Sequence, residues 1–213
     1  MVLAAVIDGR TVALEDRILD AMVGCVGRWG VAKTTTDDIA RAAGISRATL
    51  YRVFPGGRDV AFDALLRREI GRFAAAVSGP LHRADTLDDL VVAGIVEASR
   101  FLLGHEALRY VLEHEPERVL PSLAFHRLDA ALAAATAFAA PPLERFVADH
   151  ERREAGAEWL VRLLLSYAVN PSPVLDLADP ASVRRFVRTY VLPVLDQTAQ
   201  HHHSRGTSAH AAP

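Results

Sequence analysis

Apolar residues recur at steps of three and four along almost the whole chain, the period of helices that bury one face. One such face opens the chain, with apolar positions at Leu14, Ile18, Ala21, Met22, Cys25 and Trp29. It predicts a helix from about residue 11 to Gly30. We find no alternating apolar and polar run bounded by hairpin turn residues, which a half-buried strand would need. The pattern therefore predicts an all-α fold of about nine helices.

Two short helices follow the first one. Thr36, with two aspartates after it, is typical of an N-cap, because carboxylates in a first turn interact favourably with the helix dipole. Gly44 suits the left-handed position that ends such a helix. Ser46 then caps a helix predicted over 47–54, and Pro55-Gly56-Gly57 stops it.

Longer helices fill the rest of the chain. A helix from 58 into the seventies closes at Ser78-Gly79-Pro80, and its predicted buried side is Phe62, Leu65, Leu66, Ile70 and Phe73. Thr86 and Asp89 resemble a capping box that opens a helix to about Leu103. Further helices are expected near 105–114, 121–139, 142–169 and 180–197, the last opened by Asp179-Pro180 and kinked by Pro193.

The segment from 34 to 58 has the spacing of a helix-turn-helix, in which the first helix braces the second against DNA. Leu50, Val53 and Phe54 recur at helical spacing and should pack inward. The opposite face presents Arg47, Ala48, Thr49, Tyr51 and Arg52. Arginine can pair with guanine, and threonine or alanine can contact a thymine methyl group. On spacing alone, a structural two-helix corner with a solvated arginine face is the alternative.

The same residues resemble the TetR family of bacterial transcriptional regulators. The likeness covers about 14–66 and rests on Trp29-Gly30, Thr34-Thr35, Asp38-Ile39-Ala40, Ala43-Gly44-Ile45-Ser46 and Thr49-Leu50-Tyr51-Arg52-Val53-Phe54. Two positions depart from the family pattern: Val53 stands where His or Tyr is frequent, and Arg58 follows Gly56-Gly57 where a lysine is usual.

The resemblance implies a homodimer on a palindromic double-stranded DNA operator, with one 47–54 helix in each half-site. Residue by residue, it assigns base edges to Arg47, Ala48, Thr49 and Arg52, and phosphates to Thr35, Thr36, Ser46, Tyr51 and Arg58. The expected division is a DNA-binding domain over 1–57, a ligand-binding and dimerisation domain over 58–198, and a disordered tail over 199–213.

The family likeness also implies a ligand pocket and a dimer interface made by the helices near 142–169 and 180–197. Their apolar stripes are Trp159, Leu160, Leu163, Leu164 and Tyr167, and Phe186, Val187, Tyr190, Val191, Val194 and Leu195. The core of a monomer is the alternative for both stripes. For a small apolar ligand such as an acyl chain, an acyl-CoA or a drug-like molecule, the candidate residues are Phe101, His105, Arg109, Phe125, His126 and Trp159, with Arg100 as a further anchor.

Composition and charge narrow the class of protein. The net charge is −2, yet residues 33–58 hold five basic and two acidic residues, which is compatible with a DNA-binding face. One cysteine excludes an internal disulfide. No apolar stretch reaches membrane-spanning length and the N-terminus lacks a basic leader, so a cytoplasmic protein is expected.

Other chemistries find no support in the motifs. There is no phosphate-binding glycine loop, no G-x-S-x-G elbow and no H-E-x-x-H, so we expect no enzyme and no cofactor. The histidines between 105 and 126 lack the spacing of metal ligands on one helix, and no metal site is expected. The predicted function is a repressor released by its ligand. A corepressed regulator, an activator, and a helical small-molecule-binding protein with a structural helix-turn-helix are the alternatives.

Overall fold

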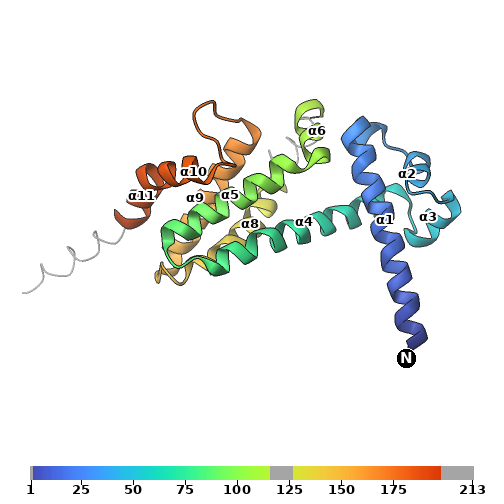
Figure 1. Cartoon of the computed structure of the whole chain (residues 1–213), viewed down its shortest axis with the longest axis horizontal. Helices are drawn as coiled ribbons and strands as arrows, with labels where there is room; N and C mark the ends of the chain where they lie inside the picture. The colour runs from blue at the N-terminus through green and yellow to red at the C-terminus, as the bar shows by residue number, and fades with distance from the viewer. Residues whose placement is uncertain (1, 116–126, 198–213) are drawn as a thin grey trace, which may run out of the picture. The chain divides into compact units, whose positions relative to one another are not determined.

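The computed structural model describes residues 2–115 and 127–197 (Figure 1). All secondary-structure elements in these residues are helices, and none is a strand. With the last three segments counted as one rod, the described residues form nine helices, so the all-α prediction is confirmed. None of the described helices is long and apolar enough to cross a membrane. The chain divides into two compact units, Met1–Ala75 with Leu102–Ser122 and Ala76–Phe101 with Leu123–Pro213.

The first helix of the first unit, α1, runs over Val2–Lys33, so the predicted start near residue 11 is wrong. Residues 2–8 hold no proline or glycine that would stop a helix, and the helical period was visible only from Leu14 onward. Gly30, the predicted end, has φ 81° and ψ 172° and introduces a kink, after which one more turn follows.

The next two helices are α2, Thr36–Ala42, and α3, Arg47–Val53. The N-cap of α2 is Thr35 rather than the predicted Thr36, because Asp38 then falls at the third helical position, where its carboxylate can reach back to the cap. Gly44 has φ 65° and Ser46 caps α3, both as predicted.

The core of the first unit is formed where α1, α2, α3 and α4 (Arg58–Arg83) pack together. Leu50 and Phe54 are buried in it and Val53 packs against it, which confirms the predicted inward face of α3. The predicted buried side of α4 is partly wrong, because Leu66 and Ile70 are 62% and 58% exposed. The helix instead turns the side with Ala61, Ala64 and Leu65 to the core.

The same unit includes α6, Glu106–His114, which packs along α1 through Ala107 and Val111. The end of α4, past residue 75, belongs to the second unit and passes through the predicted stop at Pro80 to Arg83. Val77 and Leu81, one turn apart and both buried, hold the helix together across the proline.

The second unit contains most of α5 (Leu87–Gly104), α8 (Arg127–Leu143) and α9 (His150–Val169). One half of the predicted capping box of α5 is present, since the Asp89 amide donates to Thr86 Oγ1 at 3.1 Å, and the Thr86 hydroxyl donates to Asp89 Oδ2 at 2.7 Å. The predicted helix over 142–169 begins late, at residue 150, because Pro141 and Pro142 lie in the last turn of α8 and Asp149 caps α9. The predicted start of α8 at 121 lies outside the described residues.

The last rod consists of α10 (Pro180–Phe186), a π-helical turn over Val187–Val191, and α11 (Leu192–Gln197). Asp179 caps it as predicted. The irregularity expected at Pro193 takes the form of the π turn just before it, because a proline cannot donate to a carbonyl one α-turn earlier. Val183, Val187 and Val191 are fully buried against α5 in the core of this unit.

Candidate nucleic-acid interface

A reciprocal cap fixes the start of α2. The Asp38 amide donates to Thr35 Oγ1 at 3.2 Å, and the Thr35 amide donates to Asp38 Oδ2 at 3.1 Å. The hydrogen bond from the Thr35 hydroxyl is the main reason why the pKa of Asp38 lies below its ordinary value, and nearby Arg41 adds to this effect. The Asp38 carboxylate therefore stabilises the N-terminus of α2.

A glycine turn sets the angle between α2 and α3. The amide of Gly44 donates to the carbonyl of Arg41 at 3.1 Å, and the amide of Ile45 donates to the carbonyl of Ala40 at 3.0 Å. These bonds close α2 through the left-handed Gly44 and are typical of a Schellman ending. The chain then enters α3 within two residues.

The start of α3 is held by two hydroxyl groups. Ser46 Oγ accepts from the Thr49 amide at 3.1 Å and lies 3.0 Å from Thr49 Oγ1. With Leu50 and Phe54 buried, the opposite face of the helix is turned to solvent. On that face Arg47, Ala48, Tyr51 and Arg52 are exposed, while Thr49 is half-buried. The predicted base-reading residues therefore lie together on one accessible helix face, and their DNA contacts remain predictions.

Tyr51 on this face and Arg58 at the start of α4 each contact a neighbouring stretch of backbone. A Cβ atom added to Gly57 would lie 2.8 Å from Tyr51 Cε1, so the tyrosine ring rests directly against that backbone. Arg58 Nη1 donates to the Thr34 carbonyl at 3.1 Å, and its guanidinium lies 5.8 Å from the centre of the Phe62 ring. Arg58 thus joins the start of α4 to the loop before α2, in addition to its predicted phosphate contact.

Two acidic residues of the first unit were not singled out from the sequence as site residues. Asp37 of α2 contacts Arg47 of α3, with Nε 3.0 Å from Oδ1 and Nη1 3.3 Å from Oδ2. Glu115, just after α6, accepts hydrogen bonds from the Val31 and Ala32 amides. The Asp37 contact could have been suspected from an acidic first turn beside a basic helix, whereas nothing local marks Glu115.

The predicted ligand residues are distributed over both units. His105 and Arg109 belong to the first unit. There His105 Nδ1 accepts from the Leu108 amide at 3.2 Å as the cap of α6, and its Nε2 lies 3.3 Å from Glu69 Oε2. Arg109 is exposed. Phe101, half-buried on α5, and Trp159, 36% exposed on α9, belong to the second unit. Phe125 and His126 lie outside the described residues. The ligand roles stay predictions.

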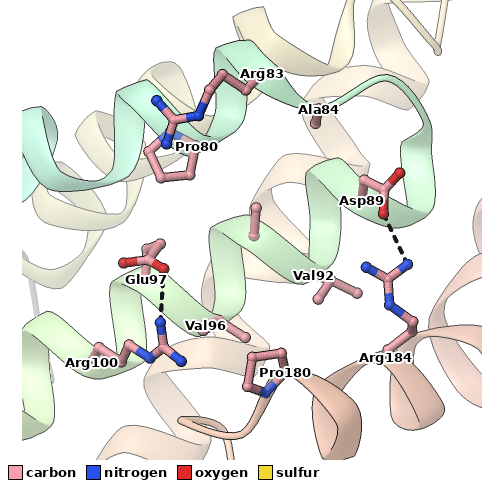
Figure 2. A pocket seen from close by; sticks show the side chains of 11 residues that line it. Pro80, Arg83, Ala84, Asp89, Val92, Val96, Glu97, Arg100, Pro180 and Arg184 are labelled. Atoms are coloured by element: carbon pink, nitrogen blue, oxygen red, sulfur yellow. Dashed lines mark hydrogen bonds and ion pairs between the residues drawn. The ribbon is translucent and has the colours of Figure 1, made fainter.

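An open groove of about 300 Å³ lies in the second unit between the end of α4, α5 and the start of α10 (Figure 2). Val92, Val96 and Pro180 supply apolar lining, and the candidate anchor Arg100 also lines it. Two ion pairs lie at its surface: Arg184 of α10 pairs with Asp89 of α5 at 2.9 Å, and Arg100 pairs with Glu97 within α5 at 3.1 Å. Hydrogen bonds from Thr86 and then Arg184 lower the pKa of Asp89.

His114, another histidine of the segment weighed as a metal site, packs against a neighbouring aromatic ring. The ring of His114 stacks on Tyr110 with centroids 4.4 Å apart. Within the described residues, no group of three or more His, Cys, Asp or Glu side chains is arranged to hold a metal ion.

Comparison with known proteins places the helix-turn-helix in a family. The family model described as "Bacterial regulatory proteins, tetR family" matches residues 18–64. An uncharacterised HTH-type transcriptional regulator of Mycobacterium tuberculosis is 29% identical over 189 residues, covering 87% of each chain. An uncharacterised HTH-type transcriptional regulator of Mycobacterium bovis is 35% identical over 103 residues, covering 48% of this chain and 52% of the relative.

Solved structures share the fold over most of the chain. The TetR family repressor AlkX from a Dietzia strain, implicated in biodegradation of n-alkanes, superimposes with a TM-score of 0.60 and 22% identity, covering 85% of this chain and 97% of its own. The fatty acid degradation regulator FadR from Bacillus halodurans gives a TM-score of 0.57 at 18% identity, covering 84% and 96%.

Proposed function

Because the chain belongs to the TetR family of transcriptional regulators, whose helix-turn-helix binds DNA, we propose that it is a homodimeric repressor released from a palindromic operator by a small apolar ligand. The observation that carries the proposal is the solvent-facing side of α3, which is anchored by buried Leu50 and Phe54 and presents two exposed arginines, Arg47 and Arg52. A recognition helix needs this combination of a rigid inner face and a basic outer one.

The proposed contacts follow from the position of each residue. Arg47, Ala48, Thr49 and Arg52 contact base edges, with an arginine suited to guanine and the two small side chains to a thymine methyl. Thr35, Thr36, Ser46, Tyr51 and Arg58 contact phosphates. The capped starts of α2 and α3 support this second set, because hydroxyl groups and backbone amides at helix N-termini bind phosphate well.

Dimerisation is proposed through α9 and the rod from α10 to α11. Some residues of their apolar stripes belong to the core of the second unit, where Leu160 and Leu164 pack against the cluster that contains Val187. Two aromatic residues of the stripes remain on the surface, Trp159 at 36% and Tyr190 at 62% exposure. Exposed aromatic residues on long helices favour an interface, since aromatic side chains are enriched in such contacts.

The effector is proposed to be an apolar or amphipathic small molecule bound in the region from 58 to 198, with the DNA-binding domain over 1–57. The relatives named for n-alkane biodegradation and fatty acid degradation make acyl chains and alkanes the first compounds to test. Residues 199–213 lie outside the described part of the chain.

The proposal is tested by selecting duplexes from a randomised library with the full chain. The expected result is an inverted repeat whose half-site centres lie about one helical turn, or about 34 Å, apart, bound by two protomers. A panel of fatty acids, acyl-CoAs and alkanes is then added to the complex. Release of DNA supports repression with induction, tighter binding indicates a corepressed regulator, and recovery of no motif contradicts the proposal.

A further inference from the structure

The ion pair between Asp37 and Arg47 connects the two helices of the helix-turn-helix through side chains that the core does not bury. Asp37 lies in the first turn of α2 and Arg47 is the first residue of α3. Their side chains remain 51% and 60% exposed, so the contact is made on the outer surface of the motif. We propose that Asp37 is a positioning residue that orients the Arg47 guanidinium for a guanine, and that it thereby determines sequence specificity. This inference rests on the proposed DNA-reading role of Arg47.

The two neighbouring aspartates of α2 have different tasks. Asp38 is engaged in the cap with Thr35 and contacts Arg41 at 3.3 Å. Asp37 is not needed for that cap and reaches across the turn to α3. An acidic residue beside a DNA-binding face has an electrostatic cost, because it repels phosphates and weakens binding to every duplex. Asp37 offsets this cost by orienting Arg47 for one base pair, which makes the arginine selective.

The donors of Arg47 allow both contacts at once. A guanidinium carries five N–H groups in one plane. Asp37 Oδ2 accepts one hydrogen of Nη1, and Asp37 Oδ1 lies 3.0 Å from Nε as an ion pair. The other Nη1 hydrogen and both Nη2 hydrogens are left. The two N–H groups needed for guanine O6 and N7 are therefore still available. A guanidinium fixed by a carboxylate also loses less conformational freedom on binding and is less able to swing to a phosphate.

The experiment measures binding of the full chain to its selected duplex and to duplexes with each base pair substituted. Arg47→Ala is expected to lose roughly tenfold discrimination at one base pair. Asp37→Ala and Asp37→Asn are expected to lose roughly threefold or more at the same base pair, while their affinity for unrelated duplexes rises. In the Arg47→Ala background, Asp37→Ala is expected to have no further effect on discrimination.

Asp63→Ala provides the matched control, because it removes an exposed carboxylate of α4 in the same unit. It should raise affinity for all duplexes equally and leave discrimination unchanged. Asp37→Ala and Asp37→Asn are first shown to unfold at the same temperature as wild type. If they then leave base-pair discrimination unchanged, as the control does, the inference is overturned while the proposed function stands. If the wild-type chain itself selects no sequence, the proposed function fails first.

Discussion

The backbone amide of Val31 donates a hydrogen bond to Glu115 Oε2 at 3.0 Å, although the two residues are 84 positions apart, and the Ala32 amide donates to Glu115 Oε1 at 3.2 Å. The kink at Gly30 makes this bond necessary. Because Gly30 leaves the helical conformation, the amides just after it lose their partners inside α1, and a buried carboxylate that is only 8% exposed replaces those partners. The end of α6 is thus fastened to the helix that precedes the helix-turn-helix.

Removing this carboxylate should destabilise the first unit. Glu115→Ala leaves two partly buried amides without an acceptor, which costs about 2 kcal/mol in the free energy of unfolding. The measurement is equilibrium denaturation in urea. Glu113→Ala, which removes an exposed carboxylate two residues earlier, serves as the control and should change stability by less than about 0.5 kcal/mol. Equal effects of the two variants would show that the Glu115 bonds contribute nothing.

Two glycines of α1 should respond to alanine in opposite directions. At Gly30 an added Cβ would collide with Glu115 Oε1 and the φ of 81° is unfavourable for alanine, so Gly30→Ala should cost about 1–3 kcal/mol. At Gly24 nothing lies within 4 Å of the added Cβ, and Gly24→Ala should stabilise by about 0.5–1 kcal/mol. Thermal unfolding of both variants checks this, and a stabilising Gly30→Ala would contradict the described kink.

Acid should weaken the start of α2. The pKa of Asp38 is lowered in the folded chain, chiefly by the hydrogen bond from the Thr35 hydroxyl. A carboxyl whose folded pKa is depressed stabilises the fold above its unfolded pKa, and this contribution is lost as pH falls through the folded value. Below about pH 4, wild type should therefore lose more stability than Asp38→Asn, measured by urea denaturation at each pH. Parallel curves for the two proteins would refute the shift.

Arg58→Ala should weaken DNA binding without altering sequence preference. The residue is proposed to neutralise one phosphate per protomer, so its removal should lower the salt slope of a dimer by about 2. Arg67→Ala, an exposed arginine further along α4, is the comparison. A change of preferred sequence in Arg58→Ala would show that its contact with the Thr34 carbonyl orients the recognition helix.

Local signals account for what the sequence predicted well. Ser46 and Gly44 were identified because a cap and a left-handed turn depend on residue types only a few positions apart. The inward face of α3 followed from helical spacing. In contrast, Leu66 and Ile70 have the helical spacing expected of a buried face, yet both are exposed. Which side of α4 is covered depends on its packing against α1, which local spacing does not reveal.

Long-range contacts account for what was missed. Pro80 stays inside α4 because Val77 and Leu81 are buried on either side of it, a tertiary effect that outweighs the local stop signal. The partners of Glu115 lie in α1, and the partner of Asp37 is ten residues away across a turn. For the ligand, the family likeness implied a pocket, while the individual residues were chosen from apolar and polar composition, which does not place them in space.

The most direct test of DNA recognition is a titration of the selected duplex and a scrambled duplex at about 50 and 200 mM salt. A dimer with Arg58 of each protomer on one phosphate should lose at least about tenfold in affinity between these concentrations and should prefer the selected sequence at both. Equal affinity for the two duplexes, or binding that does not change with salt, would contradict sequence-specific DNA binding by α3.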